Sequence, residues 1–165
     1  MKTTQKPTRR LIGGLLAAAV ACLFAVGGSA LAKDPKGSPD FEHSYDKALK
    51  KAQEEGKPVI VIFSASWCGP CQAMKKNVYP SSEVQPFHDK FVWAYLDVDE
   101  KKNKKVAEKF GVSGIPHLAI LDKDGKEIDK QVGSSAAAAF AKRLEKAAEK
   151  AGGEKEEEKE EKADS

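Results

Sequence analysis

The chain has 165 residues and carries 28 lysines and arginines against 25 aspartates and glutamates, a formal net charge of +3. Residues 1–32 hold four of these cations and no acid, so the rest of the chain has 24 basic and 25 acidic residues and is close to neutral. No basic face with interleaved aromatic residues remains, which argues against a nucleic-acid-binding protein. The length fits one folded domain.

The first 32 residues have the three parts of a secretory signal peptide. Four basic residues come first, an uncharged apolar stretch follows over 11–26, and Ala30-Leu31-Ala32 has the small-x-small pattern of a signal peptidase site. We therefore predict a signal peptide over 1–32, cleavage after Ala32, and secretion across the inner membrane into the periplasm.

Two alternatives remain for this N-terminal segment. Residues 19–22 loosely resemble a bacterial lipobox, which would place a lipid anchor on Cys22, although Ala19 replaces the usual leucine. A permanent membrane helix is the other alternative, and the glycines of the apolar stretch and the nearby cleavage site argue against it. Cleavage would remove Cys22 and leave Cys68 and Cys71 as the only cysteines.

The next residues predict a leader, a helix and a strand. Residues 33–41 include two prolines and a glycine and are expected to form a flexible leader. A helix is predicted from near Ser44 to Gly56, because apolar residues recur there at helical spacing and glycine is a common helix stop. The apolar run 58–63 is typical of a buried strand. We place the folded domain over 42–152.

The segment Trp67-Cys68-Gly69-Pro70-Cys71 carries the most chemical information. It lies between the strand 58–63 and a run of good helix formers, so Cys68 is predicted at a helix N-terminus, where unpaired N–H groups and the helix dipole favour a thiolate. Cys68 is therefore the predicted nucleophile. Cys71 falls on the same side of the helix as the predicted resolving thiol. Pro70 suits the first turn, and Trp67 offers a flat apolar surface to an incoming peptide.

The cysteine pair has two other interpretations. A zinc site would need two more ligands, but no second cysteine pair follows and the three histidines show no ligand spacing. We expect no metal and no cofactor. A purely structural disulfide is the second alternative, yet a ring this short constrains the unfolded chain weakly. Thiol–disulfide exchange is the function that this spacing favours.

The remainder of the chain predicts further alternating helices and strands, and then a charged tail. Helices alternating with strands and ending in a hairpin predict an α/β fold with a mixed central sheet covered on both faces. Residues 153–165 are nearly all charged and are expected to be disordered. The predicted elements are a short helix from Ser81, a strand over 91–98, a helix from Asn103 to Phe110, a hairpin of 118–121 with 127–132, and a helix over 136–150.

The chain resembles the thioredoxin superfamily over roughly residues 42–150. The resemblance rests on the Trp67–Cys71 motif and on the segment 111–117, Gly-Val-Ser-Gly-Ile-Pro-His, which is followed by the predicted hairpin. It implies a thioredoxin-like fold and makes Pro116 a cis-proline that packs against the active-site sulfurs. It also implies that the backbone of Ile115 pairs with a substrate strand.

The chain departs from the family pattern at three positions. Ile62 stands where thioredoxins carry a buried acid, and Tyr95 stands where they carry the lysine that faces it. His117 follows the proline where a threonine is usual. Its imidazole is either within reach of the sulfurs, where a cation would favour the Cys68 thiolate, or a polar side chain on an exposed rim.

The leading functional hypothesis is an exported protein disulfide reductase. Its site comprises Cys68 and Cys71, supported by Trp67, Gly69, Pro70 and Pro116, with Trp67, Ile115, Pro116 and His117 as candidate substrate contacts. The resemblance implies disulfide-containing protein substrates and a membrane thiol–disulfide protein as electron donor, and we expect a monomer. A disulfide oxidase or isomerase, and a redox-switched peptide-binding or chaperone module, remain as alternatives.

Overall fold

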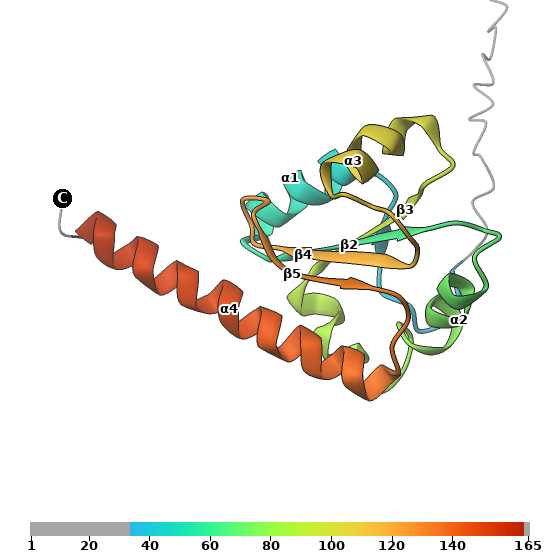
Figure 1. Ribbon diagram of the computed structural model, residues 1–165. Helices are drawn as coiled ribbons and strands as arrows, with labels where there is room; N and C mark the ends of the chain where they lie inside the picture. Colours follow the sequence, from blue (N-terminus) through green and yellow to red (C-terminus); the bar gives the residue numbers. More distant parts are fainter. Residues whose placement is uncertain (1–33, 164–165) are drawn as a thin grey trace, which may run out of the picture. The chain divides into compact units, whose positions relative to one another are not determined.

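The computed structural model describes the backbone of residues 34–163 and the side chains of residues 34–152. The predicted signal peptide and Cys22 lie outside the described residues. A five-stranded sheet with strand order β1-β3-β2-β4-β5 forms the centre of the domain (Figure 1). Its strands are β1 (Phe41–Glu42), β2 (Val59–Ser64), β3 (Val92–Asp97), β4 (His117–Leu121) and β5 (Glu127–Val132). The helices are α1 (Tyr45–Glu55), α2 (Gly69–Asn77), η1 (Gln85–Lys90), η2 (Lys101–Asn103), α3 (Lys104–Lys109) and α4 (Ala137–Ala163).

The sheet is mixed, as predicted. β3 pairs in parallel with β1 and β2, whereas β4 is antiparallel to both β2 and β5. The β4–β5 hairpin turns at Asp122–Gly125, where the side chain of Asp122 accepts from the backbone N–H groups of Asp124 and Lys126. This Asx-type turn and the positive φ of Gly125 explain why the Asp-Gly pattern marked the hairpin correctly.

Both faces of the sheet are buried, and β2 lies at the centre of the core. All six of its residues are buried, which explains its continuous apolar sequence. Ile60 and Ile62 join one apolar cluster with residues of α2 and α4, whereas Val61 and Phe63 join another with residues of α1 and α3. Helices therefore cover both faces (Figure 1), and the predicted architecture is confirmed.

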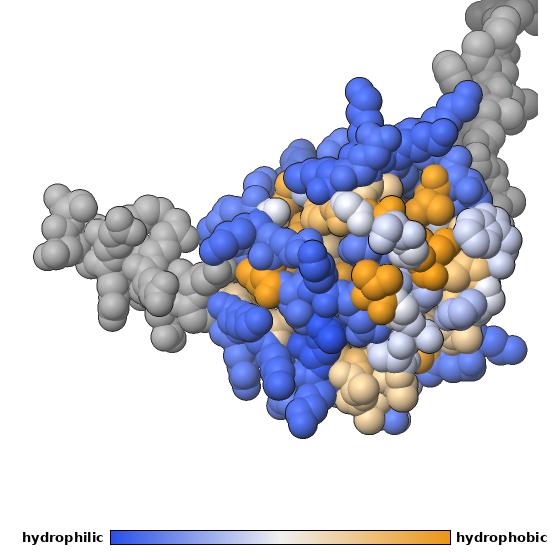
Figure 2. All heavy atoms as spheres, viewed as in Figure 1, coloured by the Kyte–Doolittle hydropathy of each residue, from blue (hydrophilic) through white to orange (hydrophobic). Residues whose placement is uncertain are grey.

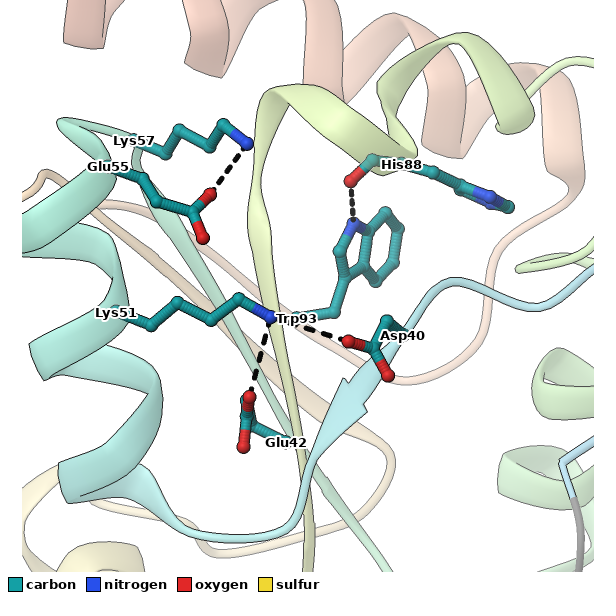
Figure 3. Close-up of polar contacts among 7 residues, drawn as sticks. All are labelled: Asp40, Glu42, Lys51, Glu55, Lys57, His88 and Trp93. Carbon is teal, nitrogen blue, oxygen red and sulfur yellow. Dashed lines mark hydrogen bonds and ion pairs between the residues drawn. The ribbon is translucent and has the colours of Figure 1, made fainter.

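The leader prediction needs correction, because residues 34–41 pack on the domain. Phe41 is buried and forms β1 by pairing with Trp93. Ion pairs join this segment to α1 (Figure 3). The Lys51 ammonium of α1 lies 3.3 Å from the carboxylate of Asp40 and 3.4 Å from that of Glu42. A two-residue strand leaves no periodic pattern, so the sequence showed only its prolines and glycine.

The last helix also differs from the prediction. α4 begins at Ala137 and packs Phe140, Leu144 and Ala147 on the sheet, as expected, but its backbone is helical as far as Ala163 rather than ending near 150. The segment expected to be disordered is rich in glutamate and lysine, which are good helix formers and can extend a helix without any core to cover. No helix among the described residues is long and apolar enough to span a membrane.

Candidate redox site

The redox motif lies where β2 ends and α2 begins. Cys68 is the N-cap of α2, with extended backbone angles of φ −82° and ψ 99°. Its N–H donates to the carbonyl of Ala65 at 3.2 Å, and the side-chain amide of Gln72 donates to the same carbonyl at 2.9 Å. Pro70 occupies the first turn, where no N–H is required. These local bonds hold Cys68 at the helix N-terminus, as the sequence predicted.

Cys68 and Cys71 form a disulfide in the structure. The backbone N–H of Cys71 also donates to the sulfur of Cys68 at 3.2 Å, so a capping donor already points at the sulfur that would carry negative charge. Cys68 is 5% exposed and Cys71 is 1% exposed. The neighbouring Gly69 and Pro70 are exposed. An incoming sulfur can therefore approach Cys68 more easily than Cys71.

The Ile115–Pro116 loop completes one side of the site. The peptide bond between these residues is cis, and Ile115 packs against the cluster of Ala65, Cys68 and Cys71. The carbonyl of Pro116 accepts from the N–H of Gly133 at 2.8 Å, which ties the loop to the end of β5. The loop that the sequence assigned to substrate contact thus lies beside the disulfide.

Trp67 forms the exposed rim of the site. The residue is 68% exposed, which is unusual for so large an apolar amino acid, yet its indole N–H donates to Asp99 at 2.8 Å. The side chain is thus oriented and exposed at once. Figure 2 shows apolar residues gathered on the side of the domain where α2 lies. An oriented aromatic surface beside a disulfide is suited to contact with a peptide.

A comparison with known protein families matches residues 45–148 to the thioredoxin-like domain. The matched region includes the disulfide, the Ile115–Pro116 loop and strands β2 to β5. The chain belongs to the thioredoxin-like family.

Individual relatives match parts of the thioredoxin-like domain. The chain is 39% identical over 89 residues to the thioredoxin-like protein HCF164, chloroplastic, of Arabidopsis thaliana, which covers 54% of this chain and 32% of the relative. It is 29% identical over 128 residues to the thiol:disulfide interchange protein DsbD of Pseudoalteromonas atlantica, which covers 72% of this chain and 22% of the relative. The chain thus spans about a third or less of the length of these relatives.

The fold agrees with that of solved thioredoxins. The solution structure of a thioredoxin from Thermus thermophilus superposes with a TM-score of 0.60 and is 29% identical in sequence. The match covers 66% of this chain and 86% of that chain. The expected thioredoxin-like fold is therefore confirmed.

The two family positions that are substituted in this thioredoxin-like domain face each other in the sheet. Ile62 of β2 and Tyr95 of β3 are register partners. The hydroxyl of Tyr95 lies 2.6 Å from that of Ser64, so a buried hydroxyl pair occupies the region where thioredoxins have an acid and a lysine. Neither residue carries a carboxylate, so this pair cannot act as a carboxylate base.

The environment of His117 contradicts one of the two hypotheses drawn from the sequence. It is only 3% exposed, and its ring packs edge-on against Phe63 at 5.8 Å on the face covered by α1 and α3. The exposed-rim hypothesis is wrong, because β4 is buried along its whole length. Among residues 34–152 both ring nitrogens lack a hydrogen-bond partner, and the ring contact described for His117 is with Phe63.

Burial also determines the charge state of His117. Desolvation lowers the pKa of the imidazole below its ordinary value, and Lys130 adds to this effect, whereas Glu127 opposes it. The ring is therefore neutral at neutral pH, and the hypothesis of an imidazolium that favours the Cys68 thiolate has no electrostatic support.

Asp99 is the site residue that the sequence analysis missed. It follows β3, and because β2 and β3 are parallel, the residues after both strands lie at the same edge of the sheet. From this rule the sequence analysis could have placed Asp99 near Trp67. Within residues 34–152 no group of three or more potential ligands is arranged to hold a metal ion.

Proposed function

We propose that this chain is an exported thioredoxin-like protein disulfide reductase. The observation that carries the proposal is the position of Cys68 at the N-cap of α2. Its sulfur accepts a hydrogen bond from the backbone N–H of Cys71, whose own side chain is buried. A helix N-terminus favours the thiolate, and the thiolate is the attacking species in disulfide exchange.

The proposed reaction has two steps. The Cys68 thiolate attacks a substrate disulfide, forms a mixed disulfide, and releases one substrate sulfur as a thiolate. Cys71 then attacks the sulfur of Cys68, which releases the second substrate sulfur and leaves the Cys68–Cys71 disulfide. The substrate gains the two electrons that the protein loses, and the two released substrate thiolates take up one proton from Cys71 and one from solvent.

The geometry around the disulfide supports a protein substrate. Trp67 presents an oriented and exposed ring, and Ile115 packs beside the sulfurs on the opposite loop. An extended segment with a disulfide could lie between them, with the backbone of Ile115 as its hydrogen-bonding partner. The name of the DsbD relative, a thiol:disulfide interchange protein, supports the same class of chemistry.

Location and electron supply belong to the same proposal. The composition of residues 1–32 supports export to the periplasm, where a membrane thiol–disulfide protein would return two electrons to the Cys68–Cys71 disulfide. In that compartment the protein would work as a monomer on oxidised proteins.

The deciding experiment is the reduction potential of the Cys68–Cys71 pair. We would titrate the chain against a defined thiol–disulfide buffer in a Cys22→Ser background, with the Cys68→Ser, Cys71→Ser variant as blank. A potential near that of thioredoxin, about −270 mV, supports a reductase, whereas a value near about −120 mV would mean that the protein donates its disulfide. A value near that of the strong oxidants would contradict the reductase proposal and favour the disulfide oxidase alternative.

The same double variant tests the binding-module alternative. A reductase without its two cysteines loses all function. A peptide-binding or chaperone module would retain peptide affinity and function in the double variant, and full retention would rule out the redox proposal.

A further inference from the structure

Lys75 is a mostly buried cation on the redox helix. It lies four residues after Cys71 on α2, so the two residues share one face of the helix. Long side chains in a helix lean toward its N-terminus, which brings the stem of Lys75 over the turn that contains Cys71. The Lys75 side chain is only 17% exposed. This degree of burial is unusual for a lysine and calls for an explanation.

Three groups from other parts of the chain hold the Lys75 ammonium in place. Its nitrogen lies 2.7 Å from the carboxylate of Asp34 in the N-terminal segment. It also lies 4.5 Å from the centre of the Tyr95 ring and 5.9 Å from that of Phe41. Cation–π contacts and an ion pair together fix a charge that a solvated lysine would leave mobile.

The contact with Tyr95 places this charge beside the position that the family fills with a lysine. Tyr95 is the register partner of Ile62, and its hydroxyl bonds Ser64, the residue before Ala65. Ala65 in turn accepts the N–H of Cys68. The ammonium, the ring and the hydroxyl pair thus form a connected set that leads from α2 toward the disulfide.

A nearby positive charge would assist the resolving step of the proposed reaction. Cys71 must lose its proton before it attacks the mixed disulfide, and burial of the thiol disfavours the thiolate. In that step the Cys71 S–H bond and the Cys68–substrate S–S bond break, and the Cys68–Cys71 bond forms. The electron pair leaves on the substrate sulfur, which takes up the proton.

We propose that Lys75 is a positioning residue for this step, and that its ammonium, held by Asp34 and Tyr95, favours the thiolate of Cys71. The step itself rests on the proposed function, but the electrostatic effect does not. Other titratable groups on the surrounding elements are His43, whose ring bonds the Tyr95 carbonyl, and Asp97 and Asp99 at the end of β3.

A purely structural role for Lys75 is the competing explanation. A cation in the last turn of α2 interacts favourably with the helix dipole, and the pair with Asp34 fastens the N-terminal segment. Lys76 is the matched control, because it lies in the same turn of α2 but is exposed. It shares the dipole effect and lacks the described contacts with Asp34 and Tyr95.

The test is a direct titration of the Cys71 thiolate by its absorbance near 240 nm. We would use a Cys22→Ser, Cys68→Ser background under reducing conditions, where Cys71 is the remaining thiol. The Lys75→Met variant is expected to raise the titration midpoint by about 0.5 pH unit or more. Lys76→Met should leave the midpoint unchanged, and Lys75→Arg should restore it.

Two outcomes would overturn the proposal. An unchanged midpoint in Lys75→Met, with reduced stability, would mean that the ion pair is only structural. A midpoint raised as much by Lys76→Met as by Lys75→Met would mean that the effect comes from the general positive charge of α2 and not from the ammonium held by Asp34 and Tyr95. The titration involves no turnover and no electron flow, so its failure is distinct from a failure of the reductase proposal.

Discussion

Trp67 and Asp99 lie 32 residues apart in the sequence, and the indole N–H of the first donates to the carboxylate of the second at 2.8 Å. The bond orients a ring that is otherwise exposed on the rim of the redox site. Its existence follows from the parallel pairing of β2 and β3, which brings the segments after both strands to one edge of the sheet.

Asp99→Ala should weaken substrate reduction without unfolding the domain. Loss of one hydrogen bond of about 1 kcal/mol lets the Trp67 ring rotate, so kcat/KM for a disulfide-bonded protein should fall roughly fivefold. Steady-state reduction kinetics would measure this, with Glu108→Gln on the exposed surface of α3 as control. Equal kcat/KM in both variants would show that the orientation of Trp67 does not matter.

Cys71→Ser should trap a mixed disulfide, and Cys68→Ser should not. Cys68 is the N-cap of α2 and is 5% exposed, whereas Cys71 lies inside the helix and is 1% exposed, so we expect Cys68 to start the exchange. We expect about tenfold more covalent adduct in Cys71→Ser when both variants meet a disulfide-bonded peptide. Non-reducing electrophoresis would measure the adduct, and more adduct in Cys68→Ser would reverse the assigned roles.

His117 should make the stability of the fold depend on pH. Its pKa is lowered in the folded state from the ordinary value of 6.5, so the unfolded chain takes up a proton first as pH falls. Well above pH 6.5 the residue contributes no pH dependence. Below it the free energy of unfolding should fall, with a slope of at most about 1.4 kcal/mol per pH unit.

A His117→Leu variant isolates this effect from other titrating groups. Leucine removes two buried nitrogens that have no described hydrogen-bond partner, so the variant should be at least as stable as the parent at pH 7.5 and more stable at pH 5. Chemical denaturation at both pH values would measure the two differences. A parent and a variant with parallel pH curves would contradict the prediction.

Phe41→Ala should destabilise the domain strongly. The ring packs edge-on against Tyr79 at 6.0 Å and against Trp93 at 6.3 Å in a buried aromatic cluster. Truncation of a buried phenylalanine typically costs about 3 kcal/mol or more. Urea denaturation would measure the loss, with the exposed Lys36→Ala as control. A loss of stability no greater than that of Lys36→Ala would indicate that residues 34–41 form a flexible leader and do not pack on the domain.

Much of the fold could be predicted because its signals are local. The continuous apolar run of β2, the glycine stop after α1 and the Asp-Gly turn of the β4–β5 hairpin each bias the few residues that carry them. The redox motif is local in the same sense. A strand followed by good helix formers places Cys68 at a helix N-terminus, and this does not depend on how the rest of the chain packs. Sequence by itself therefore determined most of the elements, their order and the dithiol, but not the short strand β1 or the length of α4.

Tertiary structure alone decided which distant groups meet. Phe41 pairs with Trp93, and Lys75 meets Asp34 and Tyr95, through registers and packing that leave no periodic trace in the sequence. The face on which His117 lies depends on the register of β4, because successive strand residues point to opposite sides of a sheet. A local pattern restricts the backbone of its own residues, whereas these contacts depend on how separate elements pack.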